Sequence, residues 1–135
     1  MLYFAYGSNL NHFQMKRRCK DSKFIKKYNL KNFRLTFRSK YRAADIEIKK
    51  NSIVPGGIFE ISKSDEKKLD IYEDYPILYK KIYLEYYNKV LMTYTMVKKT
   101  EFRCPTDRYF NVVKQGYKDC GLDSKFLLNA LKEKF

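Results

Sequence analysis

Hydrophobic and polar residues alternate along several stretches of the chain, which is the spacing expected of strands with one buried face. The clearest pair of stretches, Leu78–Tyr87 and Val90–Val97, flanks Asn88-Lys89 and predicts a β-hairpin. Alternation or strand-like composition also predicts strands at residues 2–6, 24–30, 32–38, 45–49 and 53–61. Because proline and glycine interrupt a regular ladder, Pro55-Gly56-Gly57 predicts a bulge or a sheet edge in the last of these strands.

About four short helices are predicted from apolar residues at spacings of three and four, each preceded by a capping residue. Gly7 permits a tight turn between the first strand and the first helix. The predicted caps are Ser8 or Asn9, then Ser62 in a capping box with Asp65, then Thr106, and finally Ser124. Short strands interleaved with helices predict an α+β fold built on a small mixed, barrel-like β-sheet.

Length and composition indicate a single domain, residues 1–135, that is long enough to bury a core. The 13 tyrosines and 10 phenylalanines suggest amphipathic rings that line a cavity as well as rings that fill the interior. Three separated cysteines (Cys19, Cys104, Cys120) and one histidine (His12) favour free thiols and no metal site. The chain opens on a strand rather than a signal peptide, and no apolar run reaches membrane-spanning length, so we expect a cytoplasmic protein.

Positive charge is concentrated in one part of the chain. The formal net charge is +14, and residues 11–50 hold 14 of the 29 Lys and Arg but only 3 of the 15 Asp and Glu. This segment lacks a recognisable stacking or groove-reading motif, which favours a solvated basic face over a nucleic-acid site. The alternative is a non-catalytic basic module that binds nucleic acid or another polyanion through residues 11–50.

The first predicted turn, residues 6–10, has the pattern of an anion-binding loop. A strand, a tight turn and a helix start leave backbone N–H groups unpaired beside the positive end of the helix dipole. Such groups can hold a carboxylate or a developing oxyanion. An ordinary capped turn after a buried strand shows the same sequence pattern.

Glu73 is the candidate acid or base. It lies in an aromatic neighbourhood, with Tyr72 before it and Tyr75 and Tyr79 after it. Desolvation by such neighbours raises the pKa of a carboxyl and makes it a usable proton carrier near neutral pH. The alternative is a surface acid at a helix end, beside Asp70 and Asp74.

Several segments together resemble the gamma-glutamylcyclotransferase-like family, in the family's order and over most of the chain. The most specific segment is Phe4-Ala5-Tyr6-Gly7-Ser8-Asn9-Leu10. The others are Met15, Arg18-Cys19, residues 33–37, residues 55–61, residues 69–73 followed by Tyr79, then Pro105, Arg108-Tyr109, Gly116 and Gly121-Leu122. The resemblance implies the same α+β architecture.

The resemblance also implies a reaction, in which the α-amine of a γ-glutamyl group attacks its own γ-carbonyl and releases 5-oxoproline and an amine or amino acid. It places the catalytic acid/base at Glu73 and needs neither cofactor nor metal. Substrate contacts are implied at Tyr6, Gly7, Ser8, Asn9, Leu10, Tyr79, Tyr94 and Tyr109. The expected partner is a small γ-glutamyl compound bound by a monomer or homodimer, with no nucleic acid or membrane. Asp74 departs from the family, which commonly has glycine after the catalytic acid.

Overall fold

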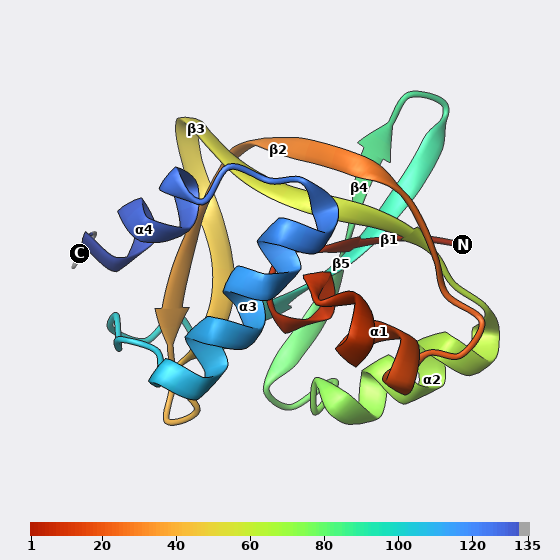
Figure 1. The fold of residues 1–135 in the computed structure, drawn as a ribbon, viewed down its shortest axis with the longest axis horizontal. Helices are drawn as coiled ribbons and strands as arrows, with labels where there is room; N and C mark the ends of the chain where they lie inside the picture. The colour runs from red at the N-terminus through yellow and green to blue at the C-terminus, as the bar shows by residue number, and fades with distance from the viewer. Residues whose placement is uncertain (133–135) are drawn as a thin grey trace.

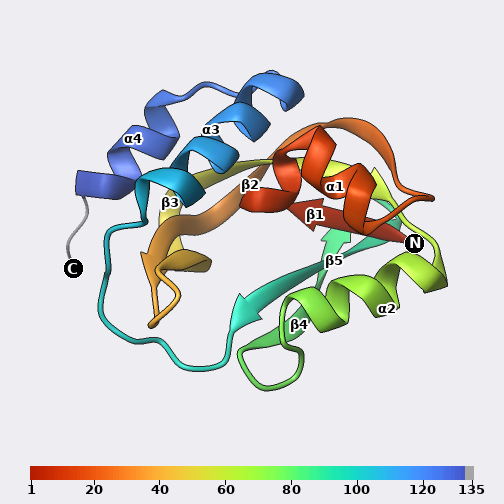
Figure 2. The ribbon, with the colours of Figure 1, turned by 60° about the horizontal axis from the view of Figure 1, so that its bottom comes forward.

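The computed structural model of the chain describes residues 1–132 and shows a five-stranded β-sheet with four α-helices (Figure 1). The elements are β1 Leu2–Ala5, the 3-10 turn η1 Ser8–Leu10, α1 His12–Arg18, β2 Lys23–Arg38, β3 Ala43–Glu60, α2 Lys63–Tyr72, β4 Tyr79–Tyr86, β5 Lys89–Met96, α3 Asp107–Cys120 and α4 Lys125–Lys132. Figure 2 shows α1, α3 and α4 along one side of the molecule, and α2 on the other side near β4 and β5.

The sheet is mixed, as the sequence predicts, with the strand order β2-β3-β1-β5-β4. The short first strand β1 lies at its centre, antiparallel to β3 and parallel to β5. The sheet is not closed by hydrogen bonds, but it curls strongly. The rings of Tyr28 on β2 and Tyr86 on β4, the two edge strands, are 5.1 Å apart. The barrel-like description therefore applies to the curl and not to a closed ring of strands.

The β2–β3 hairpin is longer than the sequence pattern suggests. The predicted strands 24–30 and 32–38 are one strand of 16 residues, and 45–49 and 53–61 belong to one strand of 18 residues. Asn32 and Asn51 take left-handed backbone angles, with φ of 67° and 66°, and the Asn51 N–H donates to Asn32 Oδ1 at 3.1 Å. The turn signals between the predicted strands thus mark a bend inside each long strand.

Pro55-Gly56-Gly57 forms neither the predicted bulge nor the predicted sheet edge, because Gly56 lies inside the sheet and the pairing with β2 is continuous from Ile53 to Ile58. Gly56 pairs with Tyr28 on β2, while the neighbouring Gly57 pairs with Ala5 on β1. A Cβ at Gly56 would lie 2.4 Å from the Ala5 carbonyl oxygen and from the Phe4 ring. Glycine is needed here because β1 and β3 approach each other closely.

Most of the predicted helix ends are found, with one correction at the first helix. Asn11, rather than Ser8 or Asn9, caps α1 by accepting from the Gln14 N–H, because residues 8–10 form a 3-10 turn of their own. The other caps are the Ser62–Asp65 capping box of α2, Thr106 at the start of α3, and Gly121 at its end with a φ of 71°.

Two classes of feature are missing from residues 1–132. No helix there combines the length and apolarity needed to cross a bilayer. No three His, Cys, Asp or Glu side chains of that range are grouped so that they could hold a metal ion.

Candidate active site

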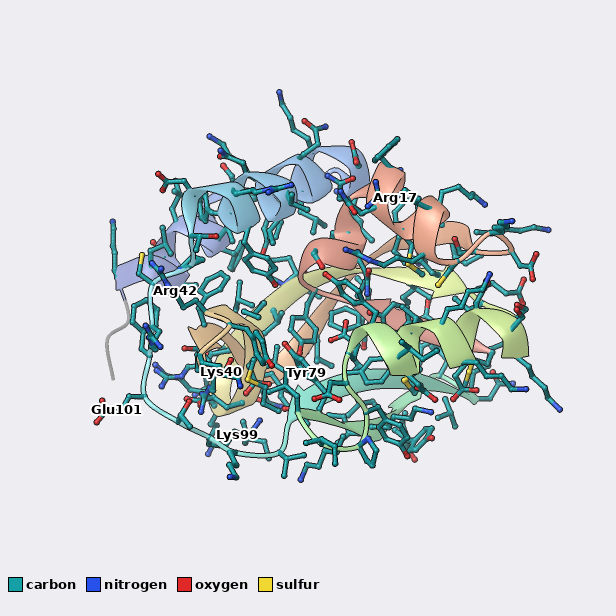
Figure 3. All side chains as sticks on the ribbon, turned by 90° about the horizontal axis from the view of Figure 1, so that it is seen from below. Arg17, Lys40, Arg42, Tyr79, Lys99 and Glu101 are labelled. Carbon is teal, nitrogen blue, oxygen red and sulfur yellow. The ribbon has the colours of Figure 1, made fainter. Side chains whose placement is uncertain are left out.

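The main cavity, about 490 Å³ in volume, forms where the turn after β1 meets the C-terminal end of α2. Strands β3, β4 and β5 and helix α3 complete its walls. Figure 3 looks onto this side of the molecule, with Tyr79 between the tip of the β2–β3 hairpin and the end of α2. The lining residues are Tyr3, Tyr6, Gly7, Ser8, Asn9, Tyr41, Ala43, Ala44, Ile71, Tyr72, Glu73, Asp74, Leu78, Tyr79, Tyr94 and Tyr109.

The turn after β1 leaves two backbone N–H groups unpaired in residues that line the cavity. The N–H groups of Leu10 and Asn11 are used inside the turn, donating to Gly7 O and Ser8 O, both at 3.1 Å. Those of Ser8 and Asn9 lie in the first turn of η1 and have no acceptor within residues 1–132. Leu10 was expected to contact substrate, but its side chain is buried in the core and does not line the cavity.

Gly7 allows the turn to approach the opposite wall. A Cβ at this position would lie 3.2 Å from Ala44 Cβ and 3.2 Å from Tyr109 Oη. Both atoms belong to residues that line the cavity. Any larger side chain would therefore displace the wall or fill the space beside the turn.

Glu73 follows the last residue of α2 and faces the same cavity. Its N–H donates to Leu69 O at 2.8 Å, which fixes the backbone, and its carboxyl Oε1 accepts from Asn9 Nδ2 at 3.4 Å. Burial raises the pKa of this carboxyl from 4.5 to about 7, and the positive charge of Arg18 opposes that rise. The structure thus brings the candidate acid/base and the first turn together across 64 residues of sequence.

Arg18, at the end of α1, contacts both the first turn and the end of α2. Its Nη1 donates to Asn9 Oδ1 at 2.7 Å, and its guanidinium lies 3.6 Å from the centroid of the Tyr72 ring. The Tyr72 hydroxyl is in turn 3.1 Å from Ser8 Oγ, within hydrogen-bond distance. Sequence reasoning assigned no contact to Arg18, because a basic residue in the last turn of a helix normally needs no partner beyond the helix dipole.

Three tyrosines of the cavity use their hydroxyl protons inside the protein. Tyr6 Oη donates to Tyr94 O at 2.7 Å, and Tyr79 Oη donates to Ala44 O at 2.6 Å. Tyr94 Oη donates to Asp70 Oδ1 at 2.6 Å. All three were expected to contact substrate, and the structure places them on the cavity wall as rings whose hydroxyl groups hold neighbouring elements in place.

Two other tyrosines of the cavity have a hydroxyl proton that no group of residues 1–132 accepts. Tyr109 Oη accepts from the Ala44 N–H at 3.1 Å, and Tyr3 Oη accepts from Asn9 Nδ2 at 3.0 Å. Neither hydroxyl donates to another group of residues 1–132. Burial raises the pKa of both, so both stay protonated at neutral pH and can donate into the cavity. Tyr109 was among the expected residues, whereas the hydroxyl of Tyr3 was hidden in an aromatic strand pattern.

The structure explains why glycine is expected after Glu73. Asp74 has a φ of 53°, a left-handed conformation that glycine adopts without strain and that Asp tolerates better than most residues. Its carbonyl oxygen accepts from the N–H groups of Ile77 and Leu78 at 2.9 and 2.8 Å. The residue is exposed at the cavity wall, and burial, rather than the Asp74 charge, raises the pKa of Glu73.

The basic segment 11–50 does not form a separate unit. It runs through α1, β2 and the first part of β3. Arg34 and Arg38 both bind Glu47 across the hairpin, and Arg38 also pairs with Asp45 at 3.3 Å. The polyanion-binding alternative stays a prediction, although these pairs neutralise part of the charge on which it depends.

Comparison with known proteins identifies the family. The family model described as gamma-glutamyl cyclotransferase, AIG2-like, matches residues 3–112, so the chain belongs to this family. The resemblance seen in the sequence is thereby confirmed. No protein in the curated set matches the chain.

Solved structures share the fold at low sequence identity. A gamma-glutamyl cyclotransferase is 24% identical with a TM-score of 0.78, over 100% of this chain and 88% of that chain. A protein from Homo sapiens described as uncharacterized protein loc79017 is 24% identical with a TM-score of 0.77, over 99% of this chain and 87% of that one. YkqA from Bacillus subtilis is 19% identical with a TM-score of 0.78, over 99% of this chain and 55% of that one. At these identities the likeness shows the shared fold.

Proposed function

We propose that this protein is a γ-glutamyl cyclotransferase. The α-amine nitrogen of a γ-glutamyl compound attacks the γ-carbonyl carbon of the same group, the amide bond to the attached amine breaks, and 5-oxoproline and that amine leave. The observation that carries the proposal is the Glu73 carboxyl, raised in pKa to about 7 and hydrogen-bonded to the Asn9 side chain of the first turn within one cavity.

Glu73 moves the proton in this reaction. The substrate amine binds as an ammonium and must lose a proton before it attacks, while the departing nitrogen must gain one. A carboxyl with a pKa of about 7 is present in both forms near neutral pH, so it can accept the first proton and return it to the leaving nitrogen. Nucleophile and electrophile belong to one molecule, so neither a covalent enzyme intermediate nor a metal is required.

The cavity supplies the remaining requirements of ring closure. The N–H groups of Ser8 and Asn9 and the hydroxyl groups of Tyr3 and Tyr109 are donors for the α-carboxylate and for the oxyanion that forms at the γ-carbonyl. Holding the glutamyl group in its folded conformer can lower the barrier by up to roughly 7–11 kcal/mol. The rings of Tyr6, Tyr79 and Tyr94 shape the space around that conformer.

The test is release of 5-oxoproline from a panel of γ-glutamyl dipeptides and γ-glutamyl amides, measured by mass spectrometry. Glu73→Gln keeps the shape of the side chain but cannot carry the proton, so we expect a loss of about 10²–10⁴-fold in kcat. Glu101→Gln, on the exposed segment after β5, is the matched control and should keep full activity. Undiminished turnover by the Glu73→Gln variant would rule out this assignment of the acid/base.

A further inference from the structure

The cavity is larger than its proposed reaction requires. A volume of about 490 Å³ lies in the range of pockets that enclose a drug-sized ligand, and a folded glutamyl group is much smaller. The remaining space must belong to the amine attached to the γ-carbonyl. The side chains that line this space therefore indicate the chemistry of that amine.

The outer wall of the cavity is apolar. Three of its lining side chains are large, hydrophobic and unusually exposed: Tyr41 is 55% exposed, Ile71 81% and Tyr72 44%. They come from two separate elements, the tip of the β2–β3 hairpin and the end of α2. Exposed apolar groups gathered at the mouth of a cavity indicate a surface that an apolar ligand covers.

The charged side chains that line the cavity are all acidic. Among residues 1–132, Glu73 and Asp74 are the charged residues of the lining, and the side chain of Asp74 has no hydrogen bond or ion pair in that range. An amino acid as leaving group would place its carboxylate one carbon from the scissile nitrogen, which Glu73 must approach. That carboxylate would meet the like charges of Glu73 and Asp74, and the lining itself supplies no cation to offset them.

Several basic side chains lie around the site but do not line the cavity. Arg18 is bonded to Asn9, as described above, and the Arg42 Nε donates to Cys104 O at 2.5 Å. The Lys40 ammonium lies 5.2 Å from the centroid of the Tyr41 ring. Figure 3 shows Lys40 and Arg42 at the tip of the β2–β3 hairpin, away from the end of α2 that carries the two acids.

We propose that the amine released by this protein carries an apolar or aromatic group and no carboxylate. The exposed ring and alkyl surfaces of Tyr41, Ile71 and Tyr72 bind that group, while Asp74 disfavours an acid at the same place. This inference rests on the proposed cyclotransferase function. It selects γ-glutamyl amides of apolar amines over γ-glutamyl amino acids.

Three substrates test the inference, because two of them each differ from γ-glutamyl-phenethylamide in one feature. γ-Glutamyl-phenethylamide and γ-glutamyl-phenylalanine differ only in the carboxylate, and γ-glutamyl-ethylamide lacks the ring. We expect kcat/KM for the phenethylamide to exceed that of both others by roughly ten-fold or more. A preference for γ-glutamyl-phenylalanine, or equal use of all three, would overturn the inference while leaving the cyclotransferase function intact. If none of the three yields 5-oxoproline, the proposed function itself fails.

Variants at the cavity mouth test which side chains determine the substrate preference. Ile71→Ser should lower kcat/KM for the phenethylamide several-fold and leave the ethylamide nearly unchanged. Ile77→Ser is the matched control, because Ile77 is 74% exposed on the segment that follows α2 but does not line the cavity. Asp74→Asn, which retains the tolerance for a left-handed backbone, should improve the use of γ-glutamyl-phenylalanine. Equal effects of Ile71→Ser and Ile77→Ser on the phenethylamide would contradict a binding role for the mouth.

Discussion

Replacing Glu73 with glutamine tests the environment of this carboxyl without any substrate. Burial raises its pKa from 4.5 to about 7, so the folded protein binds this proton more tightly than the unfolded chain does. The stability that the bound proton contributes is complete below the unfolded pKa and is lost as the pH rises through the folded one. Above pH 7 the folded protein must therefore hold a poorly solvated carboxylate.

The size of this effect follows from the shift in pKa. One pKa unit corresponds to about 1.4 kcal/mol. The rise from 4.5 to about 7 therefore means that ionising the buried carboxyl lowers the free energy of unfolding by about 3 kcal/mol. Glutamine has a similar shape and no charge to desolvate. We therefore expect Glu73→Gln to stabilise the protein at alkaline pH, with a rise in Tm of about 10 °C for a chain of this length.

Urea denaturation at about pH 5 and about pH 8.5 measures the effect, with Glu101→Gln as a control that changes an exposed carboxyl. The stability gained by Glu73→Gln should be about 2–3 kcal/mol larger at the higher pH, because the wild-type carboxyl is largely protonated in the folded state at the lower one. The control should show no such dependence. An equal effect of Glu73→Gln at both pH values would refute the argument that burial controls this group.

Three further predictions concern the residues around the site. Arg18→Ala removes the charge that lowers the pKa of Glu73, so the acid limb of the kcat/KM profile should move to higher pH; a limb that stays in place would contradict the coupling. Tyr109→Phe removes the proposed donor to the substrate and should lower kcat about 10²-fold without changing the circular dichroism spectrum, whereas an unchanged kcat would exclude that role. Gly116→Ala would place a Cβ 2.6 Å from Leu10 Cβ, and the urea midpoint should fall by the equivalent of about 2 kcal/mol or more; an unchanged midpoint would show that the turn can move.

Local sequence patterns predicted those parts of the fold that depend on neighbouring residues. The β4–β5 hairpin was predictable because both strands alternate and only a short turn joins them. The β2–β3 hairpin was divided into four strands because Asn51 is a turn residue by local preference. A left-handed backbone angle occurs both in a turn between two strands and in a bend within one continuous strand. Only the hydrogen bond of Asn51 to Asn32 on the other strand shows that this position is a bend.

The site was predictable in its residues more than in its interactions. The sequence singled out Glu73 and the first turn, but the hydrogen bond between Glu73 and Asn9 joins segments that no local pattern relates. The role of each tyrosine hydroxyl was likewise hidden, because it depends on the atom that the ring reaches in the fold. Tyr79 and Tyr109 have the same side chain, yet one donates to Ala44 O and the other accepts from its N–H.

The pKa of Glu73 shows that local burial outweighs the overall charge of the protein. A net charge of +14 favours ionised carboxyls everywhere on the molecule, yet the pKa of Glu73 moves in the opposite direction. Charges beyond about 8–10 Å are screened by salt, so Arg18, which shares Asn9 with Glu73, acts on the carboxyl while the rest of the basic segment contributes little. The removal of water by the surrounding tyrosines is not screened by salt. The acid limb of the activity profile should therefore hardly move when the salt concentration is raised, even though the protein carries a large net charge.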